Sequence, residues 1–287
     1  TSGPAGAPAI ATVPGMPPVV DPSNLYSETR ADKLSPAVAS ALPRIYVPNL
    51  KSNDVWVIDQ ATKKVVDRFR VGINPQHVVP SYDLKTLWVT NNAEHRFDGT
   101  LTPIDPMTGK PGPSVDVDNP YNMYFTPDGR SAVIVAEARK RLDFRDPQTM
   151  ALQSSLPVPG CGGINHADFS IDGRYAIFTC EFEKGTLAKI DFVERKVLDY
   201  LSLSRRGMPQ DVRISPDGKV FYVADMWSAG VFVIDGEKFV ELAFIRTGTG
   251  AHGLYPSRDG KHLYVANRGS RMVYGKPDGK GSVSVIE

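Results

Sequence analysis

The chain has 287 residues, which is long enough for one large all-β domain or two ordinary domains. Its hydrophobic fraction of 41% is sufficient for a packed core. The 33 Lys and Arg residues against 32 Asp and Glu residues leave a net charge of +1, which argues against a nucleic-acid partner, because phosphate binding needs a concentrated basic surface. No apolar run approaches the roughly 20 residues of a membrane-spanning helix.

Residues 1–43 begin with a stretch rich in Pro, Ala and Gly that shows no alternation of apolar and polar residues. This composition predicts an extended N-terminal tether, followed by a folded domain over residues 44–287. Such a tether suits a secreted or lipid-anchored protein whose targeting segment has been removed. We therefore expect an extracytoplasmic location, in the periplasm, at the cell surface or outside the cell.

One hairpin pattern repeats five times along the domain. The copies begin at His77, Asn122, His166, Asp211 and His252, at intervals of 45, 44, 45 and 41 residues. Each copy is a strand, a turn and a second strand. Four of the turns contain Asp-Gly, at residues 128–129, 172–173, 217–218 and 259–260. Asp-Gly between apolar runs is a strong hairpin signal, because Gly adopts the positive φ of a tight turn.

A third strand ending in Asp follows most of the hairpins, as in "LAKID" to Asp191 and "VFVID" to Asp235. A fourth, more polar strand comes next, as in "KVLDYLSLS". Four antiparallel strands in units of about 40 to 45 residues predict the blades of a β-propeller.

The segments "IYVPN", "LWVTNN", "FYVADM" and "LYVANRG" resemble the YVTN-repeat propellers, which are mostly bacterial and extracytoplasmic. The resemblance spans residues 44–287 and implies seven blades. We count about five and two-thirds blades in the chain. The expectation is therefore a seven-bladed propeller from which the C-terminal blade is missing; the alternative is a ring of six irregular blades.

The residue that opens each hairpin should lie near the mouth of the central channel, because the first strand of a blade lines that channel. Three of the five such residues are histidines, His77, His166 and His252, and the others are Asn122 and Asp211. Converging imidazoles would hold a transition metal such as copper, zinc or iron, or a small anion when protonated. The alternatives are a solvated channel, whose polar residues bind ordered water, and loop packing.

The two cysteines, Cys161 and Cys180, are expected at the same end of one blade and predict a disulfide in an extracytoplasmic protein. A free thiol pair or a soft-metal site with His166 is the alternative. The ends of the second strands reach the same rim, where Glu181, Asp225 and Trp227 are candidate ligand-binding residues together with Asn122 and Asp211. Trp227 would otherwise pack between blades.

The sequence contains no nucleophile elbow, P-loop or zinc-protease motif, so no catalytic residue is predicted. Two functions fit these patterns. The first is a binding or scaffold module that presents its polar, histidine-containing axial face to a protein or small ligand. The second is a metalloprotein, a redox enzyme or a metal carrier, that uses His77, His166 and His252.

Overall fold

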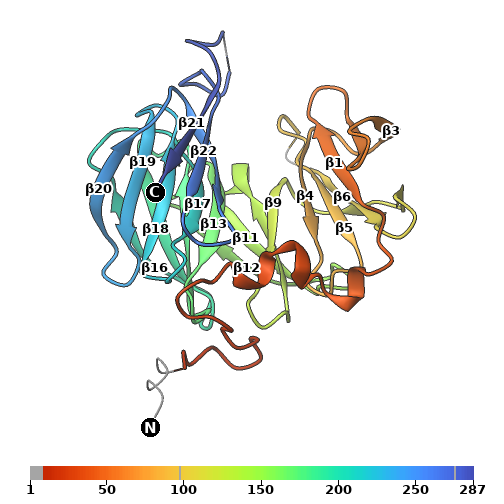
Figure 1. The fold of residues 1–287 in the computed structure, drawn as a ribbon, viewed down its shortest axis with the longest axis horizontal. Helices are drawn as coiled ribbons and strands as arrows, with labels where there is room; N and C mark the ends of the chain where they lie inside the picture. The colour runs from red at the N-terminus through yellow and green to blue at the C-terminus, as the bar shows by residue number, and fades with distance from the viewer. Residues whose placement is uncertain (1–8, 97, 275) are drawn as a thin grey trace. The chain divides into compact units, whose positions relative to one another are not determined.

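The structure is a computed structural model that describes residues 9–96, 98–274 and 276–287. These residues form an all-β propeller with six blades, each an antiparallel sheet (Figure 1). The chain divides into two compact units: unit 1 consists of residues 160–287 with the N-terminal segment up to Lys33, and unit 2 consists of residues 34–159. Each unit contains three blades.

Residues 34–159 hold blades 1 to 3, after the short helix η3 (Pro36–Val38). The strands of blade 1 are β1 (Arg44–Asn49), β2 (Asp54–Asp59) and β3 (Val65–Arg70). Those of blade 2 are β4 (Pro75–Pro80), β5 (Leu87–Asn91), β6 (Thr100–Asp105), β7 (Lys110–Pro111) and β8 (Val115–Asp116). Those of blade 3 are β9 (Pro120–Phe125), β10 (Ala132–Ala136), β11 (Arg141–Arg145) and β12 (Leu152–Pro157), with the turn η4 (Glu137–Arg139).

Residues 160–287 hold blades 4 to 6, and the short helices η1 (Ser27–Thr29) and η2 (Ala31–Lys33) belong to the same unit. The strands of blade 4 are β13 (Ile164–Phe169), β14 (Tyr175–Cys180), β15 (Thr186–Asp191) and β16 (Lys196–Ser202). Those of blade 5 are β17 (Pro209–Ile214), β18 (Val220–Asp225), β19 (Gly230–Asp235) and β20 (Val240–Arg246). Those of blade 6 are β21 (Ala251–Pro256), β22 (Leu263–Asn267) and β23 (Ser282–Ile286).

The blade count is the main correction to the expected architecture. The described residues form six sheets, and the seventh blade implied by the resemblance is not among them. Blades 1 and 6 have three strands each, which is consistent with the count of about five and two-thirds blades that the sequence repeats predict.

The hairpin turns are built as the sequence predicts. In blade 4, the Ser170 hydroxyl donates to Asp172 and accepts the backbone N–H of Tyr175, while Gly173 has φ +79°. The third strands end in Asp for a similar reason, because Asp191 accepts the N–H groups of Val193 and Glu194 and so closes the next turn.

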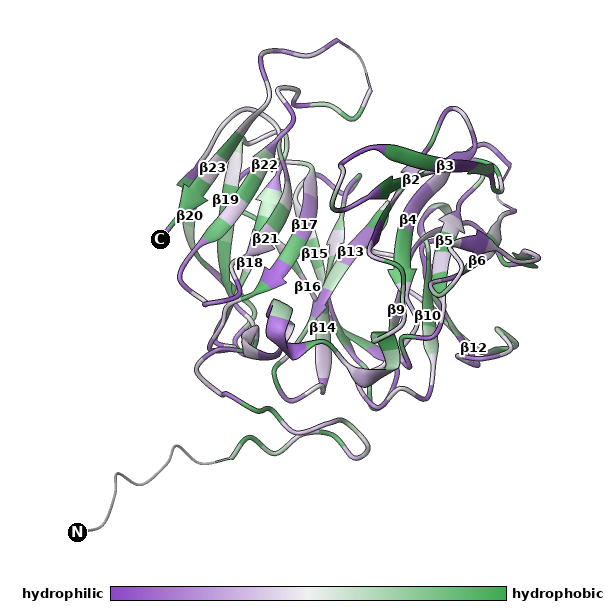
Figure 2. Cartoon of the chain, turned by 45° about the vertical axis from the view of Figure 1, so that its right-hand side comes forward, coloured by the Kyte–Doolittle hydropathy of each residue, from purple (hydrophilic) through white to green (hydrophobic). Residues whose placement is uncertain are grey.

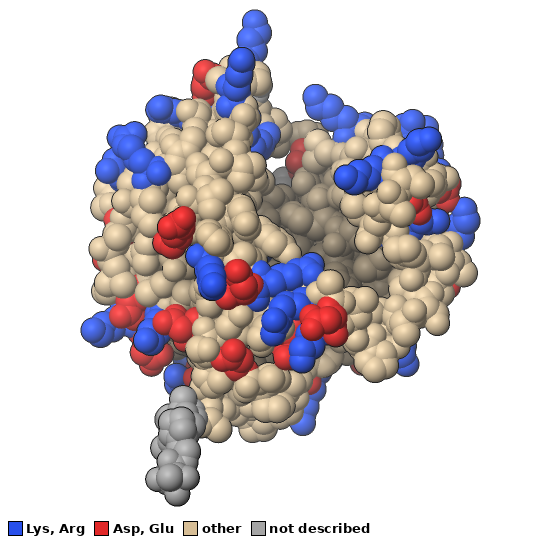
Figure 3. Space-filling model, viewed as in Figure 1, with Lys and Arg blue, Asp and Glu red and all other residues tan. Residues whose placement is uncertain are grey.

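The core lies between neighbouring sheets within each unit. Blades 4 and 5 bury Phe221, Phe232 and Ile177 in one cluster, and blades 2 and 3 bury Leu101, Met123 and Ile134 in another. Figure 2 shows hydrophobic and hydrophilic stretches following one another along the strands. On the face drawn in Figure 3, acidic and basic side chains are interspersed.

The described part of the expected tether makes specific contacts with blades 4 and 5 of unit 1. The N–H of Val13 donates to Asp172 O at 2.9 Å, that of Leu25 donates to Pro216 O at 2.8 Å, and the Tyr26 hydroxyl donates to Ile214 O at 2.6 Å. This segment therefore runs across the hairpin turns of blades 4 and 5. None of the described helices is long and apolar enough to cross a membrane.

Candidate functional site

Each of the five hairpins carries a β-bulge in its first strand, near the residue that opens it. The pairing register shifts between Pro75 and His77 in β4 and between Ile164 and Ala167 in β13, and β9, β17 and β21 show the same kind of irregularity. A bulge sets two residues opposite one and so redirects a side chain that regular alternation would point elsewhere. In blade 4 it sets Asn165 and His166 opposite Thr179.

Two of the predicted channel-mouth residues, His77 and Asp211, bond to the first strand of the next blade. In unit 2, His77 Nδ1 lies 2.9 Å from Tyr121 O of β9. Asn122 Nδ2 instead donates to the hydroxyl of Tyr124 within its own strand, β9, at 3.1 Å. In unit 1, Asp211 Oδ2 accepts the N–H of Leu254 at 2.9 Å. The contacts of His77 and Asp211 link adjacent blades.

Asp211 is buried and also pairs with Arg213 at 2.9 Å. Burial raises the pKa of Asp211 to about 6, although Arg213 and the backbone N–H groups oppose this rise. His166 is buried in β13, and His252 is partly buried in β21.

In the described part of the chain, no three His, Cys, Asp or Glu side chains are grouped so that they could hold a metal ion. The metal site at His77, His166 and His252 stays a prediction from the sequence, which metal analysis of the purified protein would test.

The Cys161–Cys180 disulfide is confirmed, with a Cα–Cα distance of 4.8 Å. It closes the loop that precedes β13 onto the end of β14. Next to it, the N–H of Glu181 donates to Gly163 O at 2.9 Å and that of Phe182 donates to Gly162 O at 3.0 Å. Gly163 has φ +64°, and a Cβ there would overlap the Phe182 ring. The loop therefore needs glycine and fixes the position of Phe182.

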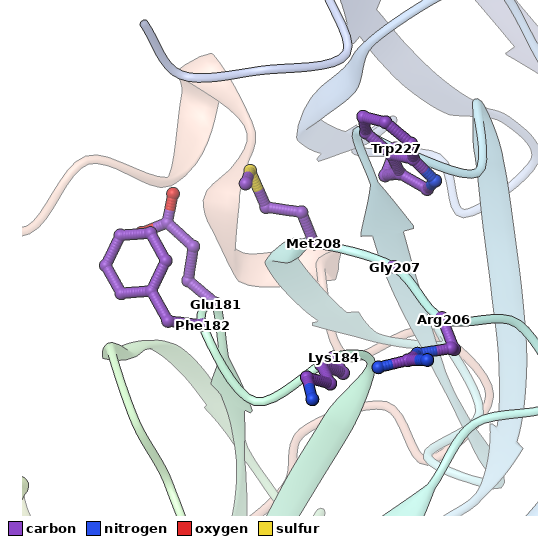
Figure 4. Close-up of a pocket in the computed structure, with 7 residues that line it drawn as sticks. All are labelled: Glu181, Phe182, Lys184, Arg206, Gly207, Met208 and Trp227. Carbon is purple, nitrogen blue, oxygen red and sulfur yellow. The ribbon is translucent and has the colours of Figure 1, made fainter.

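A pocket of about 450 Å³ opens beside this loop in unit 1 (Figure 4). Its lining comes from the loops after β14 and β18 and from the chain leading into β17: Glu181, Phe182, Lys184, Arg206, Gly207, Met208 and Trp227. Phe182 and Trp227 are 56% and 48% exposed. Two of the predicted ligand-binding residues, Glu181 and Trp227, thus line one pocket.

Glu181 is 5% exposed, and its carboxylate is held by two amides. Asn165 Nδ2 donates to its Oε2 at 2.8 Å, and Gln210 Nε2 donates to its Oε1 at 3.1 Å. Both amides come from bulges, immediately before His166 and Asp211. Sequence reasoning missed them because it assumed regular alternation in the first strands.

Asp225 lies behind the pocket wall. It is fully buried, and a Cβ on the lining residue Gly207 would overlap its carboxylate. Its Oδ1 accepts the N–H of Ser228 at 2.8 Å, which fixes the loop that carries Trp227. Burial raises the pKa of Asp225, while the hydrogen bonds to its carboxylate oppose this.

Lys184 and Arg206 were also missed by sequence reasoning, although both line the pocket. Two loops bring them together, because a Cβ on Gly185 would be 2.6 Å from Arg205 O and the N–H of Leu203 donates to Gly185 O. Figure 4 shows the charged ends of Lys184 and Arg206 on the same side of the pocket. The signal available in the sequence was the Arg205-Arg206 pair in a loop without acidic residues.

Two solved structures show the same fold at low sequence identity. Hydrazine synthase of Kuenenia stuttgartiensis matches with a TM-score of 0.67 and 19% identity, over 79% of this chain and 71% of that chain. A functionally unknown protein from Desulfotomaculum acetoxidans matches with a TM-score of 0.61 and 14% identity, over 85% of both chains.

Comparison with curated protein sequences gives no match. Comparison with protein families matches residues 5–276 to the YNCE-like beta-propeller family. This match covers most of the chain, and the antiparallel four-stranded sheets agree with a propeller. The chain therefore belongs to the YNCE-like β-propeller family.

Proposed function

We propose that the chain is a non-catalytic binding module that engages a partner protein through the rim of unit 1. The surface concerned, here named the Phe182–Trp227 surface, consists of Phe182, Lys184, Arg206, Met208 and Trp227. The observation that carries the proposal is the exposure of Phe182 and Trp227, at 56% and 48%, on either side of one pocket. Large aromatic side chains at such positions are the usual anchors of protein interfaces.

A protein partner fits this surface better than a small molecule does. Sites for small molecules enclose most of the ligand's surface, whereas both aromatic residues here are about half exposed. The residues that line the pocket include no Ser, Cys or His, and its Glu181 carboxylate already accepts two amide hydrogen bonds. These features favour binding over catalysis.

We also propose that the protein works outside the cytoplasm. The Cys161–Cys180 disulfide supports this location, because structural disulfides persist in oxidising compartments and are rare in the cytosol.

Selection from a phage-displayed random-peptide library on the immobilised protein tests the binding proposal. Enriched peptides should bind the wild-type protein, and Trp227→Ala or Phe182→Ala should weaken that binding about tenfold or more. Leu242→Ala is the matched control, because Leu242 is 56% exposed on β20 of the same unit. Circular dichroism checks that the variants are folded. The proposal fails if no enriched peptide loses affinity in the Trp227 or Phe182 variant.

A further inference from the structure

The Phe182–Trp227 surface carries two cations whose charge is not neutralised within the described residues. The side chains of Lys184 and Arg206 are exposed, and neither makes a hydrogen bond, ion pair or ring contact with another residue in the parts of the chain that the structure describes. Their charged ends lie on the same side of the pocket (Figure 4). Two neighbouring cations repel each other unless an anion lies between them.

The carboxylates around this pair are engaged elsewhere. Glu181 accepts the amides of Asn165 and Gln210. Glu241 accepts both the N–H and the hydroxyl of Ser204, at 2.7 and 2.6 Å.

The other charged residues near this pair are bonded to other groups or buried. Glu183 accepts the N–H of Gly162 at 3.1 Å, and Asp225 is buried behind Gly207. Arg205, the residue before Arg206, stacks on Phe244 at 4.3 Å. The anion that suits Lys184 and Arg206 must therefore come from another molecule.

The other half of the surface is apolar. In Figure 4, the Met208 side chain lies between those of Phe182 and Trp227. An apolar side chain from a partner would pack well on Met208 between these two rings. Methionine adapts its shape to such a contact, and its sulfur makes favourable contacts with aromatic rings. The apolar half and the cationic half belong to one pocket.

We propose that the partner presents an acidic segment to this surface, in which an Asp or Glu side chain lies beside a large apolar side chain. The carboxylate binds Arg206 and Lys184, and a guanidinium can hold it through two parallel hydrogen bonds. The apolar side chain packs between Phe182 and Trp227 on Met208. This inference rests on the proposed function and adds the chemistry of the partner.

The test uses a peptide enriched in the selection described above and a second peptide in which each Asp is replaced by Asn and each Glu by Gln. Their affinities are measured by biolayer interferometry for the wild-type protein and for the Lys184→Gln/Arg206→Gln double variant. Lys238→Gln is the matched control, because Lys238 is another exposed lysine of unit 1 without an ion pair among the described residues. The neutral peptide probes the same interaction without any change in the protein.

The expected enriched peptides combine Asp or Glu with an aromatic or large aliphatic residue. The double variant should bind the acidic peptide about 10 to 100 times more weakly than wild type, and Lys238→Gln should bind it equally well. The neutral peptide should bind wild type as weakly as the acidic peptide binds the double variant, because both lack the same pairing. Added salt should weaken only the acidic peptide's binding to wild type and to Lys238→Gln.

If enriched peptides depend on Trp227 but carry no acidic residue, or if the double variant binds them as well as wild type does, the inference is wrong and the proposed function stands. A phosphorylated form of the enriched peptide is measured in the same assay; if it alone binds the double variant more weakly than wild type, the partner's anion is a phosphate and the inference is again wrong. If no peptide depends on Trp227 or Phe182, both proposals fail.

Discussion

The backbone N–H of Phe182 donates a 3.0 Å hydrogen bond to Gly162 O, and this bond ties an exposed rim aromatic to the loop that begins at Cys161. The neighbouring bond from Glu181 to Gly163 O repeats the contact one residue earlier. The disulfide between Cys161 and Cys180 joins the start of this loop to the end of β14, directly before Glu181 and Phe182. The disulfide is thus coupled to the geometry of the pocket as well as to the stability of blade 4.

Replacing both cysteines with serine should lower the free energy of unfolding by about 3 kcal/mol. The disulfide joins residues that are 19 positions apart and so reduces the conformational freedom of the unfolded chain. Urea unfolding monitored by circular dichroism measures the difference. Hydrogen exchange should also speed up at the amides of Glu181 and Phe182 in the double variant. Equal unfolding free energies and unchanged exchange would show that the backbone hydrogen bonds hold the loop without the disulfide.

Local chemistry made the hairpins predictable from the sequence. Gly129, Gly173, Gly218 and Gly260 all have φ between +72° and +79°. In the copy without glycine, Leu84 adopts φ +61°, so the turn keeps its form even where the residue is unfavourable. The Cys161–Cys180 pairing was predictable in the same way, because the repeat places both residues at one end of blade 4.

The composition of the pocket was not predictable, for two physical reasons. A bulge leaves no mark in the alternation of a short strand, so Asn165 and Gln210 could not be assigned to Glu181. Lys184 and Arg206 meet only because the loops after β14 and before β17 approach each other closely at Gly185, which is a tertiary contact. Of the ligand-binding residues predicted from the sequence, Glu181 and Trp227 line this pocket, and Asp225 supports its wall without lining it.

The buried carboxyl of Asp211 should make stability depend on pH. Its pKa is about 6 in the folded chain against an ordinary value of 3.8, so the folded state binds more protons than the unfolded state between about pH 4 and about pH 6. The free energy of unfolding therefore falls as the pH rises through this window. The stabilising contribution of protonated Asp211 is fully lost above its folded pKa. Two pKa units correspond to about 3 kcal/mol.

Asp211→Asn isolates this effect, because asparagine does not titrate and all other groups are common to both proteins. The unfolding free energy of wild type minus that of the variant should decrease by about 2 to 3 kcal/mol between about pH 4 and about pH 7. Urea unfolding at a series of pH values measures it. A difference that does not change with pH would mean that Arg213 and the N–H of Leu254 compensate fully for the burial of the carboxylate.

Lys189 should contribute strongly to the packing of blades 4 and 5. Its Nζ donates to Gly236 O at 2.7 Å and to Glu237 O at 2.9 Å, and lies 4.1 Å from the centre of the Tyr175 ring. Lys189→Met keeps much of the apolar stem but leaves two carbonyl oxygens without their donor. We expect a loss of about 2 to 3 kcal/mol in the free energy of unfolding.

The matched control is Lys196→Met, since Lys196 is 54% exposed and pairs only with Glu194 in the described residues. Its unfolding free energy should stay within about 0.5 kcal/mol of wild type. Similar values for the two variants would mean that water or a local shift satisfies the carbonyl oxygens of residues 236 and 237.

Gly207→Ala should damage both the fold of blade 5 and the proposed binding. The added Cβ would overlap the buried Asp225 carboxylate, so the chain around residue 207 has to move. Overpacking of this kind costs about 1 to 3 kcal/mol. Gly207 also lies between the pocket residues Arg206 and Met208, so the shift should weaken peptide binding as well. Gly279→Ala is the control, because a Cβ there meets nothing within 4 Å. If thermal and urea unfolding of the two variants coincide, the contact between Gly207 and Asp225 does not constrain the pocket wall.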